Sequence, residues 1–337
     1  MKKRLISGLQ YLFFLGLGIF LVWWSLHQIP DEKWGEFKNS LQTAHFGLLV
    51  PVFLILSLSH IIRALRWRIL MNPMGYSPSF LNTFFAVMIG YLANLAVPRL
   101  GEVLKCTLLA KYEKVPAEKL IGTILIERAV DVISLCIVFL LAFIIQFDIV
   151  GEFGSQLSKQ LFENNSGRFS WFKIGMVGAI LVTLIIALKI WFYQFAHLSM
   201  VIFFNKILKG IWEGLGSVKK LKQKKLFIFY TVAIWALYIG GTWVGLLATD
   251  GTAQLGIRDA ITVLAFASIG MIVTPGGIGA YAYFLAKVLE KSNIPFEIGF
   301  ANGTLQWFAQ FLIVVLIGTF CLGMLPFYNK HKKHEIS

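Results

Sequence analysis

The stretch NLAVPRLGEVLK, residues 94–105, follows a long apolar run and brings two helix-interrupting residues together with two charges. Pro98 and Gly101 interrupt a helix where they stand. Arg99 and Glu102 would be costly in lipid unless they face protein or water. Irregular backbone at membrane depth is tolerated where protein buries it or where it lines a wet cavity. The stretch therefore predicts the tip of a helical hairpin.

The rest of the chain is equally apolar. Its 337 residues are 57% hydrophobic and 14% charged, whereas ordinary soluble domains carry about 25% charged residues. A bilayer-spanning helix needs about 20 mostly apolar residues. Such runs occur near 8–26, 46–62, 80–97, 120–147, 171–193, 226–248, 257–274 and 299–325. Because the alternating strands of a barrel are absent, the sequence predicts an all-α polytopic membrane protein.

Loop charges predict the topology. Lys and Arg gather at the N-terminus, at 63–68, at 105–119, at 206–225 and at the C-terminus, which places these segments and both termini in the cytoplasm. Residues 80–112 then leave and return on the same side, as a re-entrant hairpin. The last run must end in the cytoplasm, and the number of membrane crossings allows this only if 257–291 is a second hairpin, which enters from outside. We expect about six full spans plus two oppositely oriented re-entrant hairpins in the cytoplasmic (inner) membrane, with eight plain spans as the alternative.

This pattern predicts one integral membrane domain, 1–337, built as an inverted repeat with halves 5–147 and 171–325. Inverted repeats with broken helices are common in transporters. Segment 197–225 is expected to be a cytoplasmic basic amphipathic segment. The hairpin tips would contain Pro98 and Gly101 in the first half and Pro275, Gly276, Gly277 and Gly279 in the second.

The run 120–147 contains Glu127, Arg128 and Asp131. Residues four apart share a helical face, so the two carboxylates should point the same way. We expect the hairpin tip to supply their partners, with Arg99 between Glu127 and Asp131 and Glu102 near Arg128. These ions are candidates for binding a charged head group, and the alternative is a salt-bridge network that only holds the hairpin.

Two further groups of polar residues lie on other apolar runs or at their ends. Asn302, Gln306 and Gln310 form a stripe on the helix that the repeat pairs with 120–147. They are expected to line the opposite side of one cleft, unless they only join helices. Arg63, Arg66 and Arg68 are expected to be interfacial anchors.

Several function classes are disfavoured. The net charge of +14 follows from the loop lysines and arginines, so nucleic acid is not an expected partner. The three cysteines and six histidines are scattered, so we expect no disulfide framework and no metal site. No nucleotide-binding signature is present, and we expect no cofactor.

The motifs NLAVPRLGEVLK, ERAVD and TPGGIG, in this order, resemble the lysylphosphatidylglycerol synthase transmembrane family, also described as flippase-like, over roughly residues 10–325. The resemblance implies functional roles for Asn94, Pro98, Arg99, Gly101, Glu102, Glu127, Arg128, Asp131, Pro275, Gly276, Gly277 and Gly279. In the multiple peptide resistance factors of this family, a soluble domain transfers lysine to phosphatidylglycerol. This sequence ends at Ser337 without that domain, so synthase activity is not expected.

The sequence thus favours a lipid translocase that carries a polar or charged head group, and a phospholipid or lipid-linked head group is the expected partner. A second copy of the chain and a separate lipid-modifying enzyme are the protein partners considered. Two alternatives stay open. One is a membrane-embedded lipid-modifying enzyme with Glu127 and Asp131 as acid and base. The other is a structural or assembly protein.

Overall fold

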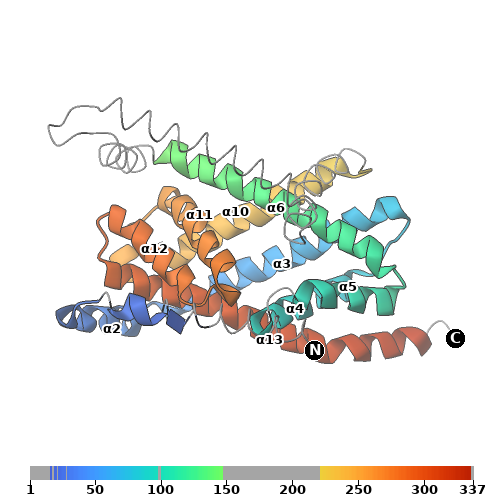
Figure 1. Cartoon of the computed structure of the whole chain (residues 1–337), viewed down its shortest axis with the longest axis horizontal. Coiled ribbons are helices and arrows are strands. Elements are labelled where there is room, and N and C mark those ends of the chain that lie inside the picture. The colour runs from blue at the N-terminus through green and yellow to red at the C-terminus, as the bar shows by residue number, and fades with distance from the viewer. Residues whose placement is uncertain are drawn as a thin grey trace, which may run out of the picture.

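The computed structural model describes residues 16, 19–20, 22–27, 29–97, 100–146 and 221–334, and every regular element in them is a helix (Figure 1). The elements are η1 Asp31–Lys33, α2 Trp34–Gln42, η2 Phe46–Leu48, α3 Leu49–Met71, η3 Asn72–Met74, α4 Phe80–Ala96, α5 Leu100–Glu113, α6 Ala117–Ile145, α10 Lys224–Leu246, η4 Asp250–Thr252, α11 Ile257–Val273, η5 Pro275–Gly277, α12 Ala280–Lys291 and α13 Phe296–His334. Most of the run 8–26, the run 171–193, residues 197–220 of the basic segment, and Pro98 and Arg99 lie outside the described residues.

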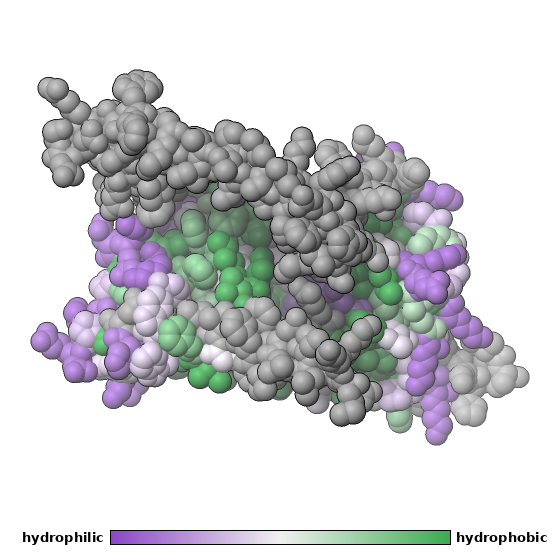
Figure 2. Space-filling view, in the orientation of Figure 1, coloured by the Kyte–Doolittle hydropathy of each residue, from purple (hydrophilic) through white to green (hydrophobic). Residues whose placement is uncertain are grey.

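Within the described residues, four helical segments are long and apolar enough to cross a membrane, and they follow the long axis of the molecule in Figure 1. They are Phe46–Met74, Ala117–Ile145, Lys224–Leu246 and Phe296–Lys330. Figure 2 shows apolar side chains over the middle of the visible face and hydrophilic ones gathered toward its two ends. This banding is what a bilayer requires of a helix bundle. The predicted all-α membrane protein is confirmed.

Helices α4 and α5 form a tight hairpin. A Cβ atom placed on Gly101 would lie 1.8 Å from the Gly90 carbonyl oxygen, so only glycine lets the two backbones approach this closely. At the tip, the Gly101 N–H donates to Asn94 Oδ1 at 2.8 Å. At the open end, the Asn82 amide donates to the Glu113 carboxylate. The start of α4 and the end of α5 therefore lie side by side, and re-entry of this hairpin into a membrane stays a prediction.

Helices α11 and α12 form a second hairpin, turned by η5. Gly276, Gly277 and Gly279 have φ values of 62°, 74° and 71°, a left-handed backbone that favours glycine. The arms touch near the tip, where a Cβ atom on Gly270 would lie 2.6 Å from the Tyr281 backbone nitrogen. In Figure 1 this hairpin lies toward the left of the bundle and α4–α5 toward the right.

The tips of the two hairpins meet. A Cβ atom on Gly276 would lie 3.0 Å from Leu95 Cδ2, which places η5 against the end of α4. Trp307 of α13 donates its indole N–H to the Gly276 carbonyl oxygen at 2.7 Å and so fixes this tip to a long helix. The end of α4 and the turn η5, about 180 residues apart in the sequence, therefore lie against one another.

Two clusters of buried apolar side chains stabilise the two ends of the helix bundle. One gathers side chains of α3, α4, α5, α6 and α10, with Trp67, Leu120 and Phe227 almost fully buried. The other joins α10, α11 and α12, with Leu246 and Leu285 completely buried. The first core supports the charged residues described next, because α3, α5 and α6 all contribute to it.

Candidate functional site

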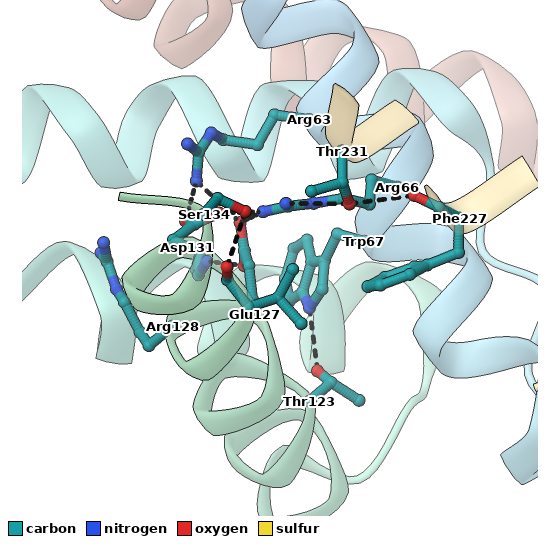
Figure 3. Close-up of polar contacts among 12 residues, drawn as sticks. Arg63, Arg66, Trp67, Thr123, Glu127, Arg128, Asp131, Ser134, Phe227 and Thr231 are labelled. Atoms are coloured by element: carbon teal, nitrogen blue, oxygen red, sulfur yellow. Dashed lines mark hydrogen bonds and ion pairs between the residues drawn. The ribbon is translucent and has the colours of Figure 1, made fainter. Parts of the chain in front are cut away.

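Glu127 lies on α6 at the centre of a buried group of charges (Figure 3). Its Oε1 atom is 3.3 Å from Arg63 Nη1 and 3.7 Å from Arg66 Nη2, both on α3. Its Oε2 atom accepts a hydrogen bond from Lys105 Nζ of α5 at 2.9 Å. The side chain is 4% exposed, so three cations hold one carboxylate away from solvent.

Asp131, one helical turn further along α6, contacts the same two arginines. Arg63 Nη1 donates to Asp131 Oδ2 at 2.6 Å, and Arg66 Nη2 donates to Asp131 Oδ1 at 2.7 Å. The prediction that Glu127 and Asp131 share one helical face is confirmed. Charge-assisted contacts of this length are the strong class of hydrogen bond.

The predicted role of Arg63 and Arg66 as interfacial anchors is wrong. Their side chains are 9% and 0% exposed, because they face the α6 carboxylates across the bundle rather than reaching toward its end. Of the three arginines, Arg68 is the one outside this group, and it donates to the Pro78 carbonyl oxygen between α3 and α4. Snorkelling needs a short path to water, whereas a carboxylate within reach gives a buried guanidinium a partner.

Glu102 and Arg128 pair as predicted. Arg128 Nε and Nη2 lie 2.8 Å and 2.6 Å from Glu102 Oε1 and join α6 to α5 just after the hairpin tip. This pair is the accessible part of the site, with side chains 48% and 33% exposed. Arg99 lies outside the described residues, and its contact with Glu127 and Asp131 stays a prediction. Among the described residues, Arg63 and Arg66 occupy the bridging role that was assigned to Arg99.

Lys105 was not among the residues singled out from the sequence. Its spacing in the sequence does indicate it, because Lys105 follows Glu102 by three residues and so lies on the same side of α5 as Glu102. Its ammonium also lies 4.7 Å from the centre of the Trp67 ring, a cation–π contact. Trp67 in turn donates its indole N–H to Thr123 of α6 at 2.8 Å. These contacts fix Lys105 against Glu127.

The polar stripe of α13 makes different contacts. Asn302 donates to the Gly245 carbonyl oxygen of α10 at 2.9 Å and to the Thr249 hydroxyl at 3.0 Å. Gln306 donates to Asn302 Oδ1 at 2.7 Å, and Tyr281 of α12 donates to Gln306 Oε1 at 3.3 Å. Asn302 and Gln306 therefore join helices, which was the alternative for them. Their role in lining a cleft, like that of the half-buried Gln310, stays a prediction.

Within the described ranges, no group of three or more His, Cys, Asp and Glu side chains is placed to hold a metal ion. The carboxylates Glu127 and Asp131 point at guanidinium and ammonium groups instead. The chemistry that this arrangement offers is ion pairing at the surface of α5 and α6 and, behind it, a buried layer of cations on α3 and α5.

Comparisons with known proteins agree with the membrane fold. The family described as Lysylphosphatidylglycerol synthase TM region matches residues 11–318, a range that includes the whole charged site. The UPF0104 membrane protein MJ1595 of Methanocaldococcus jannaschii is 23% identical over 286 residues, which cover 80% of this chain and 82% of that protein. No solved structure matches the chain.

Proposed function

This chain belongs to the lysylphosphatidylglycerol synthase TM region family, and from that premise we propose that it is a lipid translocase. It would move a polar or charged head group across the cytoplasmic membrane while the acyl tails stay in the bilayer. The proposal assigns transport alone, without transfer of an aminoacyl group.

The observation that carries the proposal is the buried charged site inside an apolar bundle. Each ionisable side chain at the middle of a membrane helix costs about 3 kcal/mol on insertion scales. Glu127 and Asp131 lie near the middle of α6 and Lys105 near the middle of α5, and their partners Arg63 and Arg66 lie in the second half of α3. Ions at this depth mark substrate pathways more often than they serve stability, because apolar residues would stabilise the bundle at lower cost.

A route to the site supports the proposal. The half-exposed Arg128 and Glu102 lie between the buried ions and the outside of the bundle. Val103, which follows Glu102, and Val132, one helical turn after Arg128, are 62% and 51% exposed, as side chains that face lipid would be. A head group could therefore approach Arg128 from the side while its tails stay against apolar residues.

In this proposal, the two hairpins are the segments that move during transport. We take α4–α5 as re-entrant from the cytoplasm and α11–α12 as re-entrant from outside, because Lys111, Lys119 and Lys330 all lie toward one end of the bundle. Their tips touch at Leu95 and Gly276. Separation of the tips on one side at a time would expose the charged site to each side in turn.

A structural role is the second candidate, because Glu127 is almost fully buried and both of its oxygens are already paired. The same pairing argues against an enzyme in which Glu127 and Asp131 act as acid and base. Carboxylates whose oxygens already face two or three cations are poorly placed to take a proton from a substrate and return it.

Reconstitution into liposomes that carry a fluorescent phospholipid tests the transport proposal. Movement between leaflets is followed by the fraction of label that a membrane-impermeant quencher can reach. We expect wild-type protein to accelerate movement and Glu127→Gln to slow it about tenfold or more, a loss of ~1.4 kcal/mol in transition-state stabilisation. Glu290→Gln, at an exposed ion pair with Lys287, is the matched control.

Two results would count against transport. Wild-type rates no higher than those of protein-free liposomes would end the proposal. A Glu127→Gln protein that is slow only to the extent that it is unfolded, as judged by size-exclusion profile and melting temperature, would assign Glu127 to the structural role instead.

A further inference from the structure

The charged site has an excess of positive charge. Its seven side chains interact as one electrostatic group on α3, α5 and α6, and they are Arg63, Arg66, Glu102, Lys105, Glu127, Arg128 and Asp131. Four of them are cations and three are carboxylates. Among the described residues the group therefore carries one uncompensated positive charge in an apolar bundle, which an anion would neutralise.

Every oxygen of the two buried carboxylates already faces a cation of the protein. Glu127 uses one oxygen for Arg63 and Arg66 and the other for Lys105. Asp131 uses one oxygen for each arginine. A positively charged ligand here would have to displace a guanidinium or ammonium that is fixed in the bundle, and would add to the existing excess.

Hydrogen-bond donors, by contrast, are left over. The Nε atoms of Arg63 and Arg66 are buried and have no hydrogen-bond partner in the described part of the chain. Both side chains are at least nine-tenths buried. Guanidinium groups match the geometry of phosphate oxygens. Arg63 and Arg66 thus each keep one N–H group without a partner, and an oxyanion is the chemical class that such a donor binds.

We propose that the site accepts a lipid head group with net negative charge, a phosphodiester, and rejects one with net positive charge such as an aminoacylated phospholipid. The phosphate would first bind Arg128 and displace Glu102 from it. Loss of the Glu102–Arg128 contact would release α5 from α6 next to the hairpin tip. This inference rests on the proposed function, and it narrows the substrate class.

Binding to the full-length protein in detergent tests the charge preference without requiring transport. The probes are short-chain phosphatidylglycerol, which is anionic, short-chain phosphatidylcholine, which is neutral, short-chain lysylphosphatidylglycerol, which is cationic, and tail-free glycerol phosphate. Isothermal titration calorimetry gives the Kd of each. We expect phosphatidylglycerol to bind about tenfold more tightly than phosphatidylcholine, ~1.4 kcal/mol, and lysylphosphatidylglycerol to bind most weakly.

Variants connect this preference to the site. Arg128→Gln should weaken phosphatidylglycerol binding about tenfold, and Glu102→Gln should strengthen it, because the competing carboxylate is gone. Lys287→Gln, at an exposed pair on α12, is the control for a general loss of positive charge. Arg128 is half exposed, so its replacement should leave the fold intact.

Three outcomes would overturn the inference. Lysylphosphatidylglycerol could bind as tightly as phosphatidylglycerol, or Arg128→Gln could bind phosphatidylglycerol as tightly as wild type does. Glycerol phosphate could also bind as tightly as the lipid, which would indicate a water-soluble anion as the ligand. The transport proposal fails separately. If anionic lipid binds selectively but labelled lipid does not move in liposomes, the translocase proposal is refuted and the proposed anion site still stands. Movement of all lipids at one rate, without charge-selective binding, would end only this inference.

Discussion

The contact between Lys105 and Glu127 gives the sharpest test of the charged site. Glu127→Gln keeps the volume of the side chain and removes the charge that faces three cations. Lys105→Met keeps most of the aliphatic stem and removes the cation that lies 2.9 Å from Glu127 Oε2. The double variant removes both charges of one pair and leaves the net charge of the site unchanged.

The distances between the charged atoms set the expected loss of unfolding free energy. Breaking a buried ion pair by removing one partner costs about 3–5 kcal/mol. Asp131 still holds both arginines at 2.6 Å and 2.7 Å, so Glu127→Gln mainly strands Lys105, and we expect about 3 kcal/mol, the low end of that range. The double variant should be about 1–3 kcal/mol more stable than the sum of the single variants, because it strands neither charge.

Unfolding in mixed micelles by a denaturing detergent, followed by the fluorescence of the ten tryptophans, measures these free energies. The exposed pair Lys287 and Glu290, at 2.8 Å, supplies a control cycle with an expected coupling below about 0.5 kcal/mol. If the Lys105 and Glu127 variants were additive within about 0.5 kcal/mol, the two side chains would not form the buried pair described above, and the charge assignment of the site would fail.

Three further predictions concern packing and polar contacts elsewhere in the bundle. Gly101→Ala should separate α4 from α5 and lower the melting temperature sharply, because its methyl group would lie 1.8 Å from a backbone oxygen of α4. Gly122→Ala, with nothing within 4 Å of its new methyl group, should leave stability equal or raise it by up to about 1 kcal/mol in the same thermal assay. Asn302→Leu should cost about 1–3 kcal/mol of unfolding free energy in the same detergent titration, because the buried Gln306 amide loses its acceptor and the Gly245 carbonyl and the Thr249 and Thr252 hydroxyls each lose one donor. A hydrogen bond from Lys33 lowers the pKa of Glu36 below its ordinary 4.5, so this contact stabilises the fold above that pH and is lost as the pH falls. An NMR titration of the carboxyl carbon should show a midpoint that returns to the ordinary value in Lys33→Met, and an unchanged midpoint would contradict the contact.

Local sequence rules predicted the parts of the site that depend on one segment. The four-residue spacing of Glu127 and Asp131 placed both on one face of α6. The positions of Pro98 and Gly101 predicted a tip close enough for Glu102 to reach Arg128, and that pair is present. Both arguments use the geometry of a single helix or of neighbouring segments, which the order of residues fixes directly.

The same rules failed for Arg63 and Arg66 because the helix that carries them is apolar around most of its surface. In a soluble protein the polar face of a helix points to water and reveals the buried face. In a membrane the lipid-facing side is as apolar as the core, so sequence periodicity does not reveal which way α3 is turned. The partners of Arg63 lie 64 and 68 residues away on α6, and only the packing of α3 against α6 brings them together.

An all-helical membrane protein with glycine-containing hairpins follows from the order of residues alone, because the backbone in lipid must satisfy its own hydrogen bonds. The same order of residues places ionisable side chains within apolar runs, where they must face protein or water. Only the tertiary structure decided which cation faces each carboxylate, and hence that the described site has one positive charge more than its carboxylates can neutralise. Charge balance in an apolar bundle depends on distances of a few ångströms between separate helices, and a one-dimensional pattern does not contain those distances.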